Sequence, residues 1–460
     1  MQRPCFVSLA SLVLVLTACG DDRGSDGADE VGTDSQSTTG TSGTTDETGS
    51  DTGTGSSTGE TGSSSDDSST SSDSSTSNDS SGIKFDVVDD DLPNDTGGGC
   101  MGGMGGDLEF SYIWIANSPE GTVSKIDTQT LVEEGRYRVR PQGGGQPSRT
   151  SVNLRGDMVV GSRDGGVTKI WARQEDCVDD NGTPGIQTST GKNDVLAWNQ
   201  EECVAWYADF SFLSERAVAW TPGEFNEGTC EYENAKVWVG ATNDSVNLQV
   251  MRLNGDTGAT EDTLQIPGTA GFMSRSPYGA AVDIDGNLWM VNAYCGGHLI
   301  FVDGADLSYE TILPPAQICP YGIAVDSQGY VWLGGYQTYT GRYDPINQTW
   351  DLVQAQGLGI QEDAQGRLWL GAYGQNGVYA IDGDTLQVIS YTPVPTTGQS
   401  KGVAIDFFGY VWVVSDAGTT AVRLDPDTLD IQTYTGLNDP YSYSDMTGWG
   451  LNNAAVVPQG

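Results

Sequence analysis

The chain has 460 residues and a formal net charge of −42, from 63 acidic and 21 basic residues, and it contains a single histidine. A negative field of this size disfavours nucleic acid and anionic membrane surfaces as partners. One histidine and the absence of any Cys-x-x-Cys pair argue against a structural zinc site.

The N-terminus has the pattern of an export signal. Arg3 supplies a positive charge, and residues 6–16 form an apolar stretch too short to span a bilayer. The sequence Leu16-Thr17-Ala18-Cys19 resembles the lipobox of bacterial lipoproteins. This resemblance implies that residues 1–18 are a cleaved signal peptide and that Cys19 is acylated, which anchors the chain in a membrane. An ordinary signal peptide followed by a chance cysteine is the alternative interpretation.

The segment 19–99 differs in composition from the rest of the chain. Residues 20–98 are mostly Ser, Thr, Gly, Asp and Glu, with 19 acidic and two basic side chains. So few apolar side chains cannot offset the conformational entropy that folding removes. We therefore expect a disordered, self-repelling linker that leads to a folded domain of residues 100–460.

The folded domain is built from a repeated motif, which reads Gly-Ile-Ala-Val-Asp-x-x-Gly-x-Val-Trp at 322–332. Each unit contains alternating apolar positions and glycine-containing turns, a pattern typical of four short strands. The seven units predict an all-β fold, a seven-bladed β-propeller, with an insertion near residues 172–205. The aligned positions are Trp114, Val159, Trp238, Trp289, Trp332, Trp369 and Trp412.

The two ends of the folded domain complement each other. The first unit has strands at 112–116 and 122–127 but no innermost strand before them. The chain end at 450–454 reads as an innermost strand with no partner after it. We expect this C-terminal strand to complete the N-terminal blade, because an unpaired edge would promote aggregation.

The repeat signature resembles that of virginiamycin B (streptogramin) lyases and NHL-type propellers, over roughly residues 110–454. For the lyases the resemblance implies a histidine before the glycine of an innermost strand, with carboxylates and a magnesium ion at the channel mouth. The only histidine, His298, matches none of these positions, so no catalytic residue is assigned. The matching positions hold Ser148, Glu215, Tyr278, Tyr321, Leu358, Lys401 and Trp449.

The repeats also predict which residues share a face of the ring. The start of each innermost strand lies on the same face as the loop between the second and third strands. This rule brings Arg149, Arg216 and Lys401 to one channel mouth, where Arg side chains suit a carboxylate or phosphate. The same face gains flat aromatic surfaces and loop residues, namely Tyr278, Tyr321, Tyr336, Tyr373, Tyr294, Arg163 and Asp416. Such a mouth would bind an anionic or aromatic ligand.

An alternative for this mouth is purely structural: Arg149 and Arg216 pair with acids such as Glu215, and the tyrosines pack between blades. Glu362 occupies an apolar strand position and therefore needs a partner or a raised pKa. Four further acids fall at the first turn of their blades, where we expect them to cap the turn; they are Asp283, Asp326, Asp363 and Asp406.

Six cysteines remain after Cys5 and Cys19, an even number that suggests disulfides in an exported chain. Cys295 and Cys319 fall on the same face of adjacent blades, which predicts a Cys295–Cys319 bridge. A Cys177–Cys203 bridge is favoured because it would close the long insertion, and Cys100–Cys230 follows by elimination.

The insertion also contains Asp176, Asp179 and Asn181 around a glycine turn, which resembles a degenerate calcium loop. It lacks the spaced ligands and the closing bidentate glutamate of such loops, so an Asx-rich turn is the alternative. Calcium is the one cofactor that the sequence suggests.

These features predict a lipid-anchored protein of the bacterial cell envelope, favoured at the outer membrane or cell surface, with the periplasm as the alternative. We expect its monomeric propeller to bind a protein, a glycan or a small anionic ligand. Two alternatives stay open: a lyase-like or other metal-assisted enzyme that uses carboxylates, and a structural component of the envelope.

Overall fold

The computed structural model describes residues 111–455, apart from residues 227, 230, 245 and 270–276. The predicted signal peptide, Cys19, the linker at 19–99 and the predicted Cys100–Cys230 bridge lie outside the described residues. Among the residues described, no helix combines the length and apolar character needed to cross a membrane.

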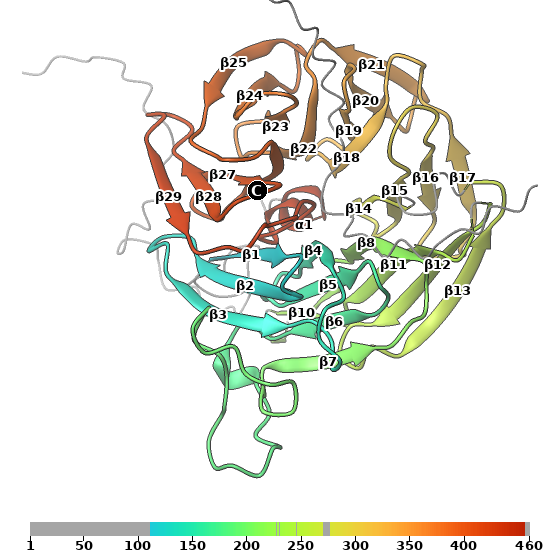
Figure 1. Ribbon diagram of the computed structural model, residues 1–460. Helices are drawn as coiled ribbons and strands as arrows, with labels where there is room; N and C mark the ends of the chain where they lie inside the picture. Colours follow the sequence, from blue (N-terminus) through green and yellow to red (C-terminus); the bar gives the residue numbers. More distant parts are fainter. Residues whose placement is uncertain (1–110, 227, 230, 245, 270–276, 456–460) are drawn as a thin grey trace, which may run out of the picture. The chain divides into compact units, whose positions relative to one another are not determined.

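The strands of the described segment form seven blades around a central channel, which confirms the predicted β-propeller (Figure 1). Blade 1 comprises β1 (Tyr112–Asn117), β2 (Thr122–Asp127) and β3 (Glu133–Arg138). Blade 2 comprises β4 (Pro147–Val152), β5 (Met158–Ser162), β6 (Val167–Ile170) and β7 (Val204–Ala208). Blade 3 comprises β8 (Ser214–Trp220), β11 (Lys236–Thr242), β12 (Leu248–Asn254) and β13 (Thr260–Ile266).

Blades 4 to 7 follow the chain without interruption. Blade 4 comprises β14 (Gly279–Val282), β15 (Leu288–Val291), β16 (Leu299–Val302) and β17 (Tyr309–Ile312). Blade 5 comprises β18 (Pro320–Val325), β19 (Val331–Gly335), β20 (Thr340–Asp344) and β21 (Thr349–Val353). Blade 6 comprises β22 (Gly357–Glu362), β23 (Arg367–Ala372), β24 (Gly377–Asp382) and β25 (Val388–Pro393). Blade 7 comprises β26 (Ser400–Ile405), β27 (Val411–Ser415), β28 (Thr420–Leu424) and β29 (Ile431–Thr435).

Among the described residues, a 3-10 turn, a two-stranded hairpin and a helix lie outside the blades. They are the 3-10 turn η1 (Gln174–Asp176), the hairpin of β9 (Glu224–Asn226) with β10 (Glu231–Glu233), and the helix α1 (Trp449–Ala455).

The repeated Asp and Trp of the motif fold each blade by the same local contacts. In blade 5, Asp326 Oδ1 accepts hydrogen bonds from the backbone N–H of Gln328 at 3.0 Å and of Tyr330 at 2.8 Å. Its Oδ2 accepts the indole N–H of Trp332 at 2.7 Å. Gly329 completes the turn at φ +86°, a conformation that favours glycine. The predicted turn-capping role is therefore confirmed, and each capping carboxylate also orients the tryptophan that fills the blade.

The ring closes through the C-terminal region, but by a different segment from the one predicted. The backbone N–H of Tyr441 donates to Ala116 O at 3.0 Å, and that of Trp114 donates to Met446 O at 2.9 Å. An isolated antiparallel bridge joins Asn117 to Pro440. Residues 440–446 therefore lie along the inner edge of β1, where the missing innermost strand of blade 1 belongs.

The expectation that residues 450–454 form this strand is wrong, because they belong to the helix α1. The carboxylate of Asp445 accepts hydrogen bonds from the backbone N–H of Gly448 at 2.8 Å and of Leu451 at 2.9 Å. An acceptor in this place satisfies donors that the first turn of a helix leaves free. Helix α1 contacts the innermost strands β14, β18, β22 and β26 and lies within the ring (Figure 1).

Candidate functional site

The predicted mouth residues converge on one end of the channel. Arg149 lies in β4, Arg216 in β8 and Lys401 in β26, all in the innermost strands of their blades. The predicted tyrosines share one cluster of packed side chains, which we call the tyrosine cluster. Its members are Tyr278, Tyr294, Tyr321, Tyr336, Tyr373, Tyr441 and Tyr443, together with Ala293 and Leu358.

Hydroxyl groups meet at the centre of the tyrosine cluster. The hydroxyl of Tyr278 donates to that of Tyr321 at 2.7 Å, and it lies 2.7 Å from the hydroxyl of Tyr441. The rings of Tyr278 and Tyr321 meet edge to face with centroids 4.7 Å apart, a favourable arrangement for aromatic pairs. These contacts join blades 4 and 5 to the closing segment at 440–446.

Arg149 is fully buried within the tyrosine cluster. Its Nε donates to the backbone carbonyl of Tyr278 at 2.8 Å, and its Nη1 donates to Ser148 Oγ. The guanidinium carbon lies 3.1 Å from the ring centroid of Tyr443 and 4.3 Å from that of Tyr278. Its Nη2 has no hydrogen-bond partner within the described residues. Burial lowers the pKa of Arg149 to about 10, so the group stays charged at neutral pH.

Three more cations lie against the same rings. The guanidinium of Arg216 is 5.2 Å from the ring centroid of Tyr278. Lys401 Nζ lies 4.3 Å from the ring centroid of Tyr441, and the guanidinium of Arg163 lies 5.0 Å from it. Four positive charges therefore share two aromatic rings, which attract cations through their faces.

Several of these residues are buried below the surface of the mouth. Tyr278 and Tyr321 are buried like Arg149, and Lys401 is buried and forms an ion pair with Asp416 at 3.3 Å. The tyrosines pack between blades, as the structural alternative proposed. Tyr336, Tyr373, Tyr441 and Arg163 stay partly exposed and form the surface of the mouth.

Glu215 is the acid that the structural alternative pairs with Arg149 and Arg216, but its carboxyl group contacts a loop of blade 2. Its Oε2 accepts the backbone N–H of Gly166 at 3.2 Å, in the loop between the second and third strands of blade 2. Burial raises the pKa of Glu215 to about 8, so the carboxyl group is mostly protonated at neutral pH. It therefore adds little negative charge to the mouth.

Tyr441 and Tyr443 are the mouth residues that the sequence analysis missed. They come from the segment that closes blade 1, which the sequence analysis did not recognise as the innermost strand. The alternation Tyr441-Ser442-Tyr443 was the available signal, because residues two apart on a strand point to the same side.

Glu362 lies at the end of β22 that is opposite to the channel mouth. Its carboxylate accepts the backbone N–H of Ser327 at 2.6 Å and the side-chain amide of Asn453 in α1. Its backbone carbonyl accepts the indole N–H of Trp449 at 2.8 Å. Burial raises the pKa of Glu362 to about 7. Both predicted consequences, a partner and a raised pKa, are confirmed, and the residue fastens α1 inside the ring.

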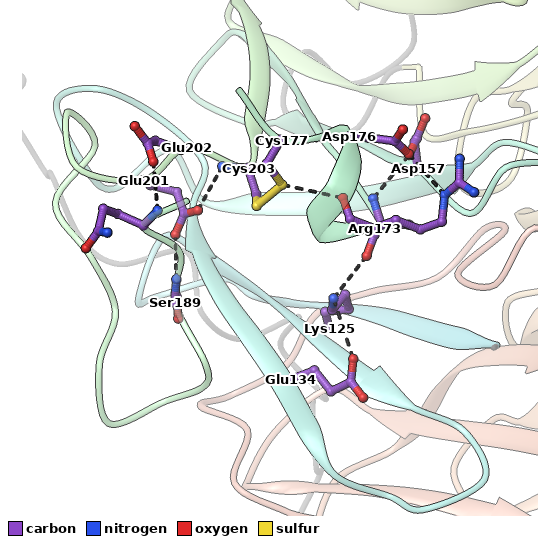
Figure 2. Close-up of a disulfide and its surroundings, with 12 residues drawn as sticks. Lys125, Glu134, Asp157, Arg173, Asp176, Cys177, Ser189, Glu201, Glu202 and Cys203 are labelled. Carbon is purple, nitrogen blue, oxygen red and sulfur yellow. Dashed lines mark hydrogen bonds and ion pairs between the residues drawn. A yellow bond between two sulfur atoms is a disulfide. The ribbon is translucent and has the colours of Figure 1, made fainter. Parts of the chain in front are cut away.

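The long insertion follows β6 and is closed by a disulfide between Cys177 and Cys203, as predicted (Figure 2). Glu201 supports the bridge, because its carboxylate accepts the backbone N–H of Cys203 at 3.0 Å and of Ser189 at 2.9 Å. The predicted Cys295–Cys319 disulfide is also present, on the mouth face between blades 4 and 5.

The three candidate calcium ligands of the insertion contact separate protein donors. Asp176 forms an ion pair with Arg173 at 3.0 Å. Asp179 Oδ2 accepts the backbone N–H of Gly185 at 2.9 Å, and Asn181 Oδ1 accepts that of Thr183 at 2.8 Å. Within the described residues, no group of three or more His, Cys, Asp or Glu side chains is placed to hold a metal. These contacts are those of an Asx-rich turn, and calcium binding stays a prediction.

Solved structures with similar folds come from several proteins. A functionally unknown protein from Desulfotomaculum acetoxidans matches with a TM-score of 0.50 and 10% identity, over 76% of this chain and 98% of that chain. Virginiamycin B lyase from Staphylococcus aureus matches with a TM-score of 0.44 and 15% identity, over 65% of this chain and 89% of that chain. AztD from Citrobacter koseri matches with a TM-score of 0.46 and 12% identity, over 72% of this chain and 97% of that chain.

No protein-family model matches the chain, and no curated protein matches it. At these identities the likeness concerns the fold alone.

Proposed function

We propose that this chain is an envelope lipoprotein whose propeller binds a small anionic ligand at the channel mouth of the tyrosine cluster. The observation that carries this proposal is the convergence of Arg149, Arg163, Arg216 and Lys401 on the rings of Tyr278 and Tyr441. These cations gather in a chain whose net charge is −42.

The cations differ in how they would act. Arg149 is fully buried, so it raises the electrostatic potential of the mouth without touching a ligand in solution, whereas the charge of Lys401 is balanced by its ion pair with Asp416. The field of Arg149 is only weakly screened, because this group is buried. Arg163 is partly exposed; its Nε donates to Gln146 O at 3.3 Å and its Nη2 donates to Ser118 Oγ, and its other N–H groups can be offered to a carboxylate or phosphate.

The exposed aromatic surface sets the shape of the ligand. The rings of Tyr336 and Tyr373 meet edge to face at 4.9 Å and are both partly exposed. A planar apolar body would pack on these exposed rings. The proposed ligand is therefore a small aromatic acid, and a compact inorganic anion is the simpler case.

Isothermal titration calorimetry on the full chain tests the proposal with benzoate and inorganic phosphate as separate probes. We expect benzoate to bind more tightly than phosphate, and both affinities to fall as ionic strength rises. Replacing the exposed cation, Arg163→Gln, should weaken benzoate binding by about tenfold, because a charge-assisted hydrogen bond is lost.

Arg173→Gln is the matched control, since Arg173 is a partly exposed arginine in the insertion, outside the tyrosine cluster. It should leave both affinities unchanged. Absence of binding by both probes, or equal binding by the Arg163→Gln variant, would contradict the proposed site.

The anchor is a separate part of the proposal and rests on the lipobox-like sequence at Leu16-Thr17-Ala18-Cys19. Expression in bacteria with radiolabelled palmitate should label the wild-type chain and leave Cys19→Ala unlabelled. Equal labelling of the two proteins would show that Cys19 is not the acylated residue. It would not bear on the proposed ligand site.

A further inference from the structure

A pocket of about 400 Å³ opens between the loops of blade 5, beside the tyrosine cluster, because the side chain of its lining residue Gln337 donates to the hydroxyl of Tyr373. It is formed by the loop before β18, the loop between β19 and β20, and the loop before β22. The lining residues are Gln317, Gln337, Thr338, Tyr339, Gln354, Ala355 and Gln356. This volume lies within the range of small-molecule sites.

The chemistry of this pocket is unusual for the chain. Four of its seven lining residues are glutamines and none is charged, although the chain carries 84 charged side chains (63 acidic and 21 basic). Within the described residues, the side-chain amides of Gln317, Gln354 and Gln356 make no hydrogen bond to the protein, and all three are exposed. Each amide can donate two hydrogen bonds and accept others.

The backbone of the pocket is held in place by contacts between its loops. The N–H of Tyr339 donates to Gln317 O at 3.2 Å, and the N–H of Thr340 donates to Ala355 O at 3.0 Å. The hydroxyl of Thr338 accepts the N–H of Cys319 at 2.9 Å, and Cys319 is bonded to Cys295. A rigid site loses less conformational entropy when it binds a ligand.

We infer that this blade 5 pocket is a carbohydrate site that binds a neutral pyranose unit of a glycan. Ring hydroxyls donate and accept hydrogen bonds, so adjacent hydroxyls match the paired donors and acceptor of an amide. The ring of Tyr339, whose exposed fraction is 37%, offers a flat face for the C–H groups of a sugar.

Other ligand classes fit this pocket less well. A charged ligand would lose hydration without finding an opposite charge among the lining residues, which is costly. An apolar ligand would leave several amide groups without hydrogen-bond partners, which is costly as well. A peptide offers amide donors and acceptors too, and is therefore included in the test.

The test uses the full chain and saturation-transfer difference NMR with glucose, galactose, mannose, N-acetylglucosamine and the neutral peptide Gly-Gly-Gly. We expect at least one sugar to bind saturably with a Kd of about 1 mM, as befits a single sugar unit held by few contacts. Gly-Gly-Gly should give no signal. If the peptide binds and no sugar does, or if nothing binds, the inference is wrong.

Single substitutions test whether the sugar binds in this pocket. Gln354→Ala and Gln356→Ala should each weaken the binding of the sugar by about three- to tenfold, the value of one hydrogen bond. Gln375→Ala is the matched control, because Gln375 is an exposed glutamine in a blade 6 loop on the same face, outside the pocket. Equal affinity in all three variants would place the sugar elsewhere and overturn the inference.

Arg163→Gln separates this site from the proposed anion site. It should leave sugar binding unchanged, because Arg163 is not among the lining residues of the pocket. Gln354, Gln356 and Gln375 are exposed and Arg163 is partly exposed, so an unchanged circular dichroism spectrum and Tm will show that the variants are folded.

Discussion

Blade 2 and blades 4 to 7 form the same turn between their first two strands, but with different side chains. In blades 4 to 7, an aspartate caps the first turn and also accepts the indole N–H of the tryptophan on the next strand, at 2.7–3.0 Å. Blade 2 has Val159 where the others have tryptophan, so there is no indole for a carboxylate to bind.

In blade 2, Asn153 and Asp157 divide the two roles of that aspartate. Asn153 Oδ1 accepts the backbone N–H of Arg155 and of Asp157, each at 2.9 Å, which reproduces the turn of the other blades. Asp157 then binds the backbone N–H of Ala172 at 3.1 Å and pairs with buried Lys169 at 3.6 Å. The repeat therefore preserves the turn hydrogen bonds and a buried carboxylate, while the partner of that carboxylate changes from an indole to an ammonium group.

The largest effect is expected where this replacement buries charge. Lys169→Met should lower the free energy of unfolding by about 4 kcal/mol, because Asp157 then stays buried without its cation. Burial alone already raises the pKa of Asp157 and lowers that of Lys169. Urea denaturation at pH 7, followed by tryptophan fluorescence, measures the loss.

The double variant Lys169→Met with Asp157→Asn keeps an acceptor for the N–H of Ala172 and removes the unpaired charge. It should be more stable than Lys169→Met alone. If the double variant is no better, the ion pair is not what compensates for the missing tryptophan.

The comparison also explains how far the fold could be predicted from the sequence. The Asp-x-x-Gly turns and the register of Trp332 and its equivalents predict blades 4 to 7, because turn, strand and core signals coincide in one short motif. The closing segment at 440–446 has no such motif, since it pairs with β1 across more than 300 residues. Residues 450–454 have strand-like spacing, but the Asp445 cap directs them into a helix.

The sequence places the mouth residues on the correct face but leaves their depth undetermined. Strand position alone determines the face on which Arg149 and Tyr278 lie. Burial depends on neighbours from the closing segment, above all Tyr443, which packs at 3.1 Å on the guanidinium of Arg149. The blade 5 pocket could not be predicted, because its glutamines come from three separate loops.

A smaller difference in stability is expected between two of the turn-capping aspartates of blades 4 to 7. Asp406 is fully buried, whereas Asp283 keeps some contact with solvent. Asp406→Ala leaves the indole N–H of Trp412 and two backbone N–H groups without their acceptor, at a cost of about 3 kcal/mol. Asp283→Ala should cost about 1 kcal/mol, because water can replace part of the lost contacts. Equal urea midpoints for the two variants would show that burial does not decide the strength of the cap.

The last effect is a dependence of stability on pH, and it concerns Glu215, which stands in blade 3 where blade 6 has the apolar Leu358. The folded pKa of about 8 exceeds the ordinary value of 4.5, so the folded chain holds a proton that the unfolded chain releases between these values. This group therefore makes the fold less stable as pH rises from about 4.5 to 8, by about 1.4 kcal/mol for each pH unit at most. Glu215→Gln removes the titration. The stability difference between Glu215→Gln and wild type should grow from pH 5 to pH 8 and then level off.

Urea denaturation at pH 5, 6, 7, 8 and 9 measures this difference, with the exposed Glu310→Gln as the control that should show no trend. The same measurements test the charge state of Glu215 beside the arginines of the channel mouth. If Glu215 were ionised and paired with Arg149 or Arg216, the Gln variant would lose stability at pH 7 instead of gaining it. That sign would place a carboxylate charge among the cations and remove the electrostatic basis of the proposed anion site.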